Sequence, residues 1–358
     1  ALDAVAARLR RIIDEDGPRS VATYTGTGGY QNSLALPSAR AFHHGIGSSS
    51  IYTSVTIDQP AKATAPFRTG IWEAGYHNFS GADVLLAIGY NPMVSSFGPV
   101  GGLQGTNPFV VLRDAQRDGL RLIVIDPRRS ELASHADLHL AIRPGEDPTL
   151  LAGITKIILE EELFDEDFCS AWVGDLEHLA RTVAPFDIDL VARRCGVESA
   201  DIDAAARMFA AGRRGTAGAG TGPNMAPHSG LVEHFVIVLN TLCGRVNRPG
   251  DRVESGHFLV ADTPRRAQVV APRNPTPGPH ARVRDLRGIR GEMPTSTLAE
   301  EILTPGPGRI RALIVSGGNP VVAWPDQELT IRAMHEPDLG HTRRVLVSYL
   351  SEWTGGPK

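Results

Sequence analysis

One short pattern occurs twice in this chain of 358 residues and limits the folds that it can adopt. Residues 85–94 read LLAIGYNPMV and residues 313–322 read LIVSGGNPVV, so the two copies start 228 positions apart. Each copy is an apolar run that breaks into Gly-x-Asn-Pro. An apolar run of this length, bounded by turn residues, is typical of a parallel strand that is buried on both faces.

The residues after each apolar run suit a loop that binds a ligand. Glycine permits a sharp turn, asparagine tolerates left-handed backbone, and proline favours the first position of a helix. The amides that follow such a proline have no helical partners, so they can bind an anion. We therefore predict two similar ligand loops, which contain Gly89, Asn91, Pro92, Gly317, Asn319 and Pro320.

Predicted strands alternate with predicted helices along most of the chain, a pattern that favours an α/β fold with parallel sheets. The sequence predicts two Rossmann-like parallel-sheet lobes that are related by an internal repeat, with one lobe inserted in the other. We expect residues 1–50 and 215–358 to form the first lobe and residues 51–214 to form the second. The predicted strands cover residues 20–25, 50–57, 83–89, 121–126, 139–143, 216–220, 310–316 and 344–349.

Composition argues against several classes of partner. The net charge is −4 and aromatic residues make up only 6% of the chain, which disfavours nucleic-acid binding. No apolar run reaches the roughly 18 residues that a membrane span requires. Residues 246–296 are rich in proline, arginine and glycine, so we expect a long irregular segment there.

The three cysteines, at positions 169, 195 and 243, are far apart in the sequence. They lack the close spacing that iron–sulfur clusters and structural zinc sites use, so we expect three buried, reduced thiols. Reduced thiols favour a cytoplasmic setting, although an export signal upstream of the first residue is not excluded. The pair His43-His44 ends a predicted helix, where we expect it to cap the helix or lie on the surface.

Two further loops carry charged residues directly after predicted strands. Asp126 and Arg128 follow one strand, where an acid can bind ribose hydroxyls and an arginine can hold phosphate. Gly145 and Asp147 follow the next strand. Asp147 either caps the helix that begins at Pro148 or binds the edge of a purine with its carboxylate.

A glycine-rich stretch with Gly218 and Gly220 also follows a predicted strand, as a loop close to a phosphate would. It lacks both the Lys-Ser/Thr of a phosphate-binding loop and the Gly-x-Gly-x-x-Gly of nicotinamide dehydrogenases, so as a motif it is weak. His228, close to this stretch, is a candidate for contact with a cofactor.

Taken in order, these segments resemble the molybdopterin oxidoreductases of the dimethyl sulfoxide reductase family, which includes formate dehydrogenases and nitrate reductases. The ordered set is far more specific than any one member of it. The matching segments are Tyr24–Gly26, Asp83–Pro92, Ile125–Arg129, Pro144–Asp147, Gly218–Gly220, Leu242–Gly250 and Ile314–Pro320.

The resemblance implies an enzyme that binds molybdenum or tungsten between two molybdopterin guanine dinucleotides, one held by each lobe. It also implies a small-molecule substrate and an electron-transfer partner protein or subunit. Family members usually begin with a cysteine-rich domain that carries a [4Fe–4S] cluster and end with a β-rich domain. We expect this chain to contain the two central domains alone and therefore to be inactive in isolation.

The resemblance places the family's protein ligand to the metal at Asp58, a few residues after the short segment Ile51-Tyr52. A carboxylate oxygen is a hard ligand that suits a high-valent metal ion. Formate dehydrogenases have histidine at the next position, where this chain has Gln59. Asp58 and Gln59 are thus the predicted catalytic residues, and they favour oxygen-atom transfer or a related two-electron reaction over formate oxidation.

One alternative is a structural, metal-free relative, such as the large peripheral subunit of a respiratory NADH dehydrogenase. The presence of both Gly-x-Asn-Pro loops and of the loop at Asp126 counts against that alternative. A turn aspartate before Gln59-Pro60 is the corresponding alternative for Asp58.

Overall fold

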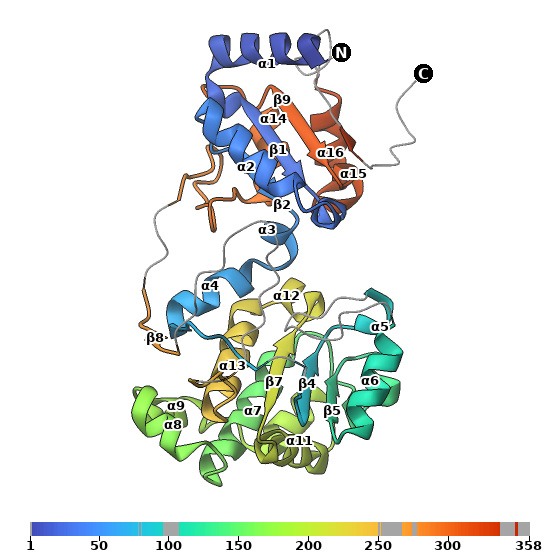
Figure 1. Ribbon diagram of the computed structural model, residues 1–358, viewed down its shortest axis with the longest axis vertical. Coiled ribbons are helices and arrows are strands. Elements are labelled where there is room, and N and C mark those ends of the chain that lie inside the picture. The colour runs from blue at the N-terminus through green and yellow to red at the C-terminus, as the bar shows by residue number, and fades with distance from the viewer. Residues whose placement is uncertain are drawn as a thin grey trace. The chain divides into compact units, whose positions relative to one another are not determined.

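The computed structural model describes residues 2–77, 79, 81–95, 107–249, 251, 267–273, 278–336 and the backbone of 348–349. The chain forms two compact units (Figure 1). Residues 1–63 and 275–358 make up the outer unit, and residues 64–274 make up the inserted unit.

The outer unit is built on a parallel sheet with the strand order β10-β9-β1-β2. Side chains of β1 (Val21–Thr25) alternate between two cores. Val21 packs with α1 and α2, whereas Ala22 and Tyr24 pack with α14, α15 and α16. The other elements are α1 (Leu2–Asp16), α2 (Ala35–Ile46), β2 (Ile51–Thr53), α3 (Val55–Asp58), α4 (Pro60–Thr69, which continues into the inserted unit), α14 (Leu298–Leu303), β9 (Ala312–Ser316), α15 (Pro320–Ala323), α16 (Gln327–Met334) and β10 (Ser348–Tyr349).

The inserted unit has a second parallel sheet, with the strand order β6-β5-β4-β7. All five residues of β4 (Val84–Ile88) are buried, because helices cover both faces of this sheet. The remaining elements are β3 (Ile71–Trp72), α5 (Pro92–Ser95), α6 (Pro108–Arg117), β5 (Arg121–Ile125), β6 (Leu138–Leu140), α7 (Asp147–Glu160), α8 (Glu166–Trp172), α9 (Leu176–Val183), α10 (Ile188–Cys195), α11 (Ser199–Ala211), β7 (Gly215–Ala219), α12 (Thr221–Met225), α13 (Ser229–Leu242) and β8 (Val269–Val270).

The predicted α/β class with parallel sheets is confirmed, but the units divide at other residues than expected. We expected boundaries at 50/51 and 214/215, whereas the structure divides at 63/64 and 274/275. Strand β2 pairs with β1, which keeps it in the outer unit. Strand β7 pairs with β4, so the chain from β7 to β8 belongs to the inserted unit.

Three local predictions also need correction. The strand expected over residues 50–57 ends at Thr53, and the short helix α3 follows it. His43 is fully buried and not a surface group. Within the region expected to be irregular, β8 forms a short antiparallel pair with β3; residues 250, 252–266 and 274–277 of that region lie outside the described residues.

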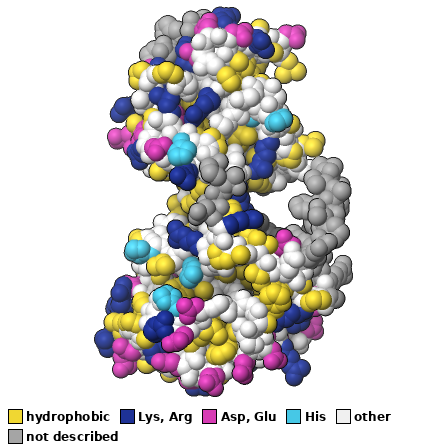
Figure 2. All heavy atoms as spheres, turned by 90° about the vertical axis from the view of Figure 1, so that its left-hand side faces the viewer, with side chains coloured by type: hydrophobic (Ala, Val, Ile, Leu, Met, Phe, Trp, Pro, Cys, Tyr) yellow, Lys and Arg dark blue, Asp and Glu magenta, His cyan; other side chains and the backbone are white. Residues whose placement is uncertain are grey.

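The three cysteines are buried and unpaired, as predicted. No helix among the described residues is long and apolar enough to cross a membrane. On the face that Figure 2 shows, Lys and Arg side chains are interspersed with Asp and Glu side chains. Arg207, for example, pairs with both Asp203 and Glu161.

Strand β7 lies at one edge of its sheet, and a side chain from α13 completes its hydrogen bonds. Asn240 is 1% exposed. Its side-chain oxygen accepts a bond from the Ala217 N–H (2.8 Å), and its side-chain nitrogen donates to the Ala217 carbonyl oxygen (2.9 Å). These bonds replace the neighbouring strand that an edge strand lacks, since buried backbone groups need partners.

Replacing Asn240 with leucine is expected to lower the free energy of unfolding by about 2–4 kcal/mol, because two buried backbone groups lose their partners. Urea unfolding measures this loss. Thr182→Val is the control, since the Thr182 hydroxyl bonds only a carbonyl of its own helix; its effect should stay within about 0.5 kcal/mol. Equal effects of the two variants would contradict this role of Asn240.

The buried His43 makes stability depend on pH. Its Nε2 lies 2.8 Å from the hydroxyl oxygen of Thr23. Burial lowers the pKa of His43 from 6.5 to about 4, so between these values the unfolded chain binds more protons than the folded chain. The free energy of unfolding should therefore fall as the pH drops from 6.5 towards 4.

Between pH 7 and pH 5, the variant His43→Gln should lose less stability than the wild type, by roughly 1–2 kcal/mol. Urea unfolding at both pH values measures the difference. The exposed neighbour His44 provides the control variant His44→Gln, which should retain the wild-type pH dependence. A His43→Gln variant with an unchanged pH dependence would refute the assignment.

Candidate functional site

In-register pairing brings four loops of the inserted unit to one edge of its sheet. Ile88 at the end of β4 pairs with Ile125 of β5 and with Ala219 of β7. Ile125 in turn pairs with Leu140 of β6. The loops that follow these four strands contain most of the predicted ligand residues, so the structure places Gly89, Asp126 and Gly220 at the same edge.

The loop after β4 turns sharply at Gly89, whose φ of +60° is in the left-handed region. A Cβ atom at Gly89 would collide with the ring of Pro223, so glycine permits the close packing of two loops at this position. Pro92 begins the short helix α5, as predicted. The Asn91 side-chain nitrogen donates to Glu131, while the buried Asn91 side-chain oxygen has no hydrogen-bond partner among the described residues.

The loop after β5 is held by Asp126 and carries an exposed arginine. The Asp126 carboxylate accepts the Arg128 backbone N–H at 2.8 Å, and the Asp126 carbonyl oxygen lies 2.9 Å from Nε2 of His139. The Arg128 guanidinium lies 3.4 Å from Glu131. Glu131 thus contacts both Asn91 and Arg128, and it links the first two loops.

Asp147 does not cap the helix that follows β6. The cap residue of α7 is Glu146, which bonds the Thr149 hydroxyl and forms a two-bond ion pair with Arg194. Asp147 is the first residue of the helix and only 7% exposed. Burial raises the pKa of Asp147, and the nearby Asp126 carboxylate raises it further.

Gly145 lies in the turn before α7 with a φ of +91°, a conformation that favours glycine. A Cβ atom at Gly145 would meet no atom within 4 Å, in contrast to Gly89. Glycine at position 145 is therefore explained by the backbone conformation of the turn and not by close packing. The space next to Gly145, which precedes Asp147 by two residues, is open.

The glycine-rich stretch after β7 differs from its prediction in one respect: Gly218 lies inside the strand, so the loop begins only at Gly220. The Gly220 N–H bonds the carbonyl of Ile88 at 2.7 Å, and a Cβ atom there would collide with Tyr90. Asn224, which is 5% exposed, donates to the Gly220 carbonyl and to Glu233. Its side-chain oxygen is buried without a hydrogen-bond partner among the described residues.

His228 is exposed and precedes the first turn of α13. Its φ of +63° is unusual for a residue other than glycine. The structure thus places it after the loop at Gly220, on the approach to a helix N-terminus.

The second Gly-x-Asn-Pro loop lies in the outer unit, after β9. Gly317 has a φ of +58°, and a Cβ atom there would collide with the backbone at Gly28 and Gly29. The Asn319 side-chain oxygen accepts the Val321 N–H, and Pro320 begins the helix α15. The two Gly-x-Asn-Pro segments thus have the same local structure, a strand followed by a left-handed glycine and a short helix.

Asp58 is the last residue of α3 in the outer unit and is half-buried. Burial raises its pKa, whereas Lys62 lowers it. Tyr24, at the carboxyl end of β1, is close enough for the Asp58 carboxylate to affect it: burial, together with that carboxylate, raises the pKa of Tyr24 to about 12. Gln59 directly follows α3.

Both units thus offer features that a bound group would satisfy. The inserted unit has a buried carboxylate beside a second acid, and two buried amide oxygens that have no partner among the described residues. In the outer unit, the buried hydroxyl of Thr25 has no hydrogen-bond partner among the described residues. Buried polar groups normally have partners, so a polar cofactor bound at these loops would supply the partners that these atoms lack among the described residues.

A metal ion would need ligands beyond those of the protein. Within the described ranges, no three His, Cys, Asp or Glu side chains lie together as a metal site. A single protein ligand, such as Asp58, would have to be joined by ligands from the cofactor.

Sequence reasoning missed Glu131, Asn224 and Glu233. Asn224 and Glu233 interrupt otherwise apolar stretches, and a polar residue in such a position is a signal that could have identified them. Glu131 shows no such signal, because its role depends on a contact with Asn91 across two loops.

Known proteins are similar to this sequence over most of its length. The family described as Molybdopterin oxidoreductase matches residues 1–340. The chain is 26% identical to the nitrate reductase of Klebsiella oxytoca over 351 residues, which cover 93% of the chain and 38% of that enzyme. It is 30% identical to the acetylene hydratase of Syntrophotalea acetylenica over 210 residues, 59% of the chain and 27% of that enzyme.

Formate dehydrogenase H of Escherichia coli is 28% identical over 218 residues, or 59% of the chain and 28% of that enzyme. The solved structure of acetylene hydratase from Pelobacter acetylenicus covers 98% of the chain with a TM-score of 0.72 at 19% identity, and the chain covers 49% of it. The chain therefore spans half or less of each of these relatives. Because the family match extends over nearly the whole chain and its relatives are enzymes, we conclude that this chain belongs to the molybdopterin oxidoreductase family.

Proposed function

We propose that this chain is the central, cofactor-binding part of a molybdenum or tungsten enzyme that carries out a two-electron reaction on a small molecule. The family implies a metal–pterin cofactor. The observation that carries the proposal lies at the loop edge of the inserted sheet: the buried oxygens of Asn91 and Asn224 have no partner in the part of the chain that the structure describes, and Asp147 lies beside Asp126. When bound, the metal–pterin group would supply the redox chemistry, while the protein binds and orients it.

We also propose that the two units are Rossmann-like lobes related by an internal repeat, and that each lobe binds one pterin guanine dinucleotide. Support comes from the matching local structures at Gly89 and Gly317, each at the carboxyl end of a parallel strand. Ligands of open parallel sheets bind at that edge. The proposed contacts of the two dinucleotides are Gly89, Asn91, Pro92, Asp126, Arg128, Gly145, Asp147, Gly220 and His228 in the inserted unit, and Gly317, Asn319 and Pro320 in the outer unit.

Within this proposal, Asp147 binds the guanine edge. A carboxylate can accept two N–H bonds from guanine, and the open space at Gly145 leaves room for a planar base. Arg128, which is exposed and close to Asp126, is placed to hold a phosphate. Gly218 lies inside β7, so Gly220 alone is the proposed contact from this glycine-rich stretch.

We further propose Asp58 as the protein ligand of the metal, with Gln59 beside it. The half-buried carboxylate at the end of α3 has a raised pKa, so bringing a cation close to it would stabilise its ionised form. The neutral Gln59 can donate and accept hydrogen bonds but cannot take up a proton at neutral pH. This pair favours oxygen-atom transfer over a reaction that needs a general base.

The substrate, the electron-transfer partner and a [4Fe–4S] cluster in a further domain are parts of the same proposal. A hydration reaction is the second candidate, because an acetylene hydratase is among the relatives. The two candidate reactions differ in their need for electrons. Removal of an oxygen atom from a substrate consumes two electrons, which a reduced dye can donate, whereas hydration consumes none. The metal-free alternative is not favoured, since the relatives named above are enzymes. A cytoplasmic location stays a prediction, because one relative is a periplasmic nitrate reductase.

Asp58→Ala in the intact enzyme should lower turnover by more than about a hundredfold, since loss of a metal ligand exceeds the effect of its supporting residues. Pterin content should stay close to that of the wild type, because the proposed dinucleotide contacts lie elsewhere. Dye-linked turnover and pterin fluorescence after oxidation measure the two effects. The exposed acid Asp14 gives the control Asp14→Ala, and wild-type turnover of Asp58→Ala would remove the ligand assignment.

Asp147→Asn should lower the guanine nucleotide content of the purified enzyme, because an amide presents a donor where guanine also has donors. We expect at least about a tenfold loss of affinity. Nucleotide released by acid hydrolysis measures the content. Glu146→Gln is the control, as it alters the cap of the same helix and should retain the nucleotide. If both variants retain it, Asp147 does not bind the base.

A further inference from the structure

The inserted unit contains a cavity of about 520 Å³ that none of the proposed cofactor contacts lines. It lies among the end of α4, β3, α8, α9, β8 and the C-terminal half of α13. Asn240 holds that half of α13 against the middle of β7. Its volume is in the range of sites for small organic molecules, roughly 300–1,000 Å³.

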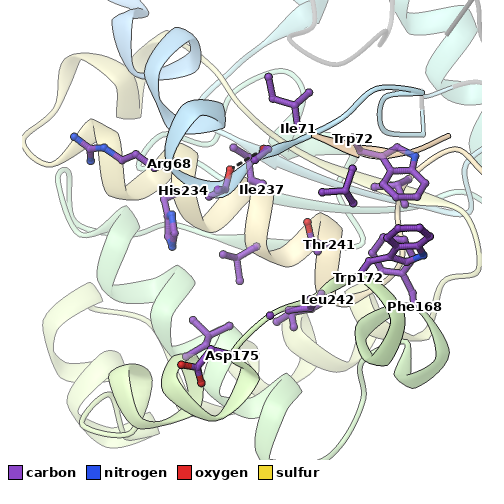
Figure 3. A pocket seen from close by; sticks show the side chains of 18 of the residues that line it. Arg68, Ile71, Trp72, Phe168, Trp172, Asp175, His234, Ile237, Thr241 and Leu242 are labelled. Carbon is purple, nitrogen blue, oxygen red and sulfur yellow. Dashed lines mark hydrogen bonds between the residues drawn. The ribbon is translucent and has the colours of Figure 1, made fainter. Parts of the chain in front are cut away.

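One side of the cavity is aromatic. Figure 3 shows Trp72, Trp172 and Phe168 grouped together there. Trp72 stands edge-on to Phe168, with ring centroids 5.4 Å apart, and edge-on to Trp172 at 5.5 Å. The Trp72 indole N–H bonds the carbonyl of Asn247 at 2.7 Å, which fixes the ring. Trp172 is 51% exposed, so it forms an aromatic rim that a ligand can reach.

The other side of the cavity is cationic at its rim. Figure 3 shows Arg68 and His234 across the cavity from the tryptophans, with Arg68 directed outwards. Arg68 is exposed and has no carboxylate within ion-pair distance among the described residues. Burial lowers the pKa of His234, and Arg68 lowers it further, so this side chain is neutral and can donate one hydrogen bond.

Apolar side chains line most of the space between these two sides, among them Ile237, Val238 and Leu179. The one acid in the lining, Asp175, already accepts the His178 N–H as the cap of α9. Burial raises the pKa of Tyr76, which also lines the cavity, to about 12, so this side chain adds no charge at neutral pH. The cavity is thus an apolar space with one aromatic wall and, at its mouth, an arginine without an ion-pair partner among the described residues.

We propose that this cavity is a second ligand site, which binds a small planar aromatic molecule that carries an anionic group. The ring would lie against Trp72 and Trp172, since aromatic pairs gain from edge-on and offset contacts. The anion would meet Arg68 at the mouth, where it keeps part of its hydration. Displacement of water from the apolar lining favours binding. This inference depends on the inserted unit alone and does not rest on the proposed function.

Calorimetric titration of the intact protein with 2-naphthoate tests the site, with 2-naphthamide as the uncharged twin. We expect saturable one-to-one binding, with naphthoate about fivefold tighter, which corresponds to one partly exposed ion pair. Arg68→Gln should remove that difference and leave the amide unaffected. Arg113→Gln, which changes an exposed arginine of α6, should change neither affinity.

Val238→Phe should weaken both probes by about tenfold or more, because the larger ring occupies the cavity. If that variant fails to fold, Trp172→Ala, which truncates a half-exposed rim residue, should weaken both probes instead. All these variants should retain wild-type cofactor content, since no proposed cofactor contact lines the cavity. Absence of binding, equal affinities of the two probes, or binding that resists both Val238→Phe and Trp172→Ala would overturn the proposal.

Discussion

In-register parallel pairing of short buried strands is the interaction on which both units depend. Pairing of β4 with β5 and β7 brings the carboxyl ends of the three strands to the same edge of the sheet. The three loops that follow these strands must therefore pack closely against one another. Glycine is required there because a Cβ atom at Gly89 or Gly220 would collide with the neighbouring loop. The same holds at Gly317 in the outer unit, where β9 pairs with β1. The glycines therefore serve loop packing first, and the ligand edge is a consequence of it.

Hydrogen bonds of buried side chains support the scaffold and also leave acceptors at the candidate site. In the scaffold, Asn240 completes the edge strand β7, and Arg245 donates to the carbonyls of Phe209, Ala210 and Gly212 at the end of α11. The Arg245 Nε is nevertheless buried without a partner among the described residues. At the loop edge, Asn91 and Asn224 each have a buried oxygen without a partner within the described ranges. An unmade buried hydrogen bond costs about 1–3 kcal/mol, so a bound group that supplied donors there would gain that energy.

The two ligand sites that we propose would bind their ligands through different interactions. The loop edge presents carboxylates, amides and backbone groups, which suit a polar dinucleotide held by directed bonds. The cavity along α13 presents Trp72, Trp172 and apolar side chains, with one cation at its mouth. Apolar burial would supply most of the affinity there, and Arg68 would supply selectivity for charge. A single chain can hold both because none of the proposed cofactor contacts lines the cavity.

The sequence by itself determined the α/β class, the strands β4, β5 and β9, the left-handed glycines of the two Gly-x-Asn-Pro loops and the family. These depend on local patterns that neighbouring residues set: apolar runs, glycine conformations and proline at helix starts. The tertiary structure alone decided that β7 belongs to the inserted unit, because the partner of a strand lies far away in sequence. It also decided that Glu146 and not Asp147 occupies the N-cap position of α7, where the Glu146 side chain pairs with Arg194 of a distant helix. The burial of His43 and the cavity beside Trp72 likewise depend on how distant elements pack, which no local pattern records.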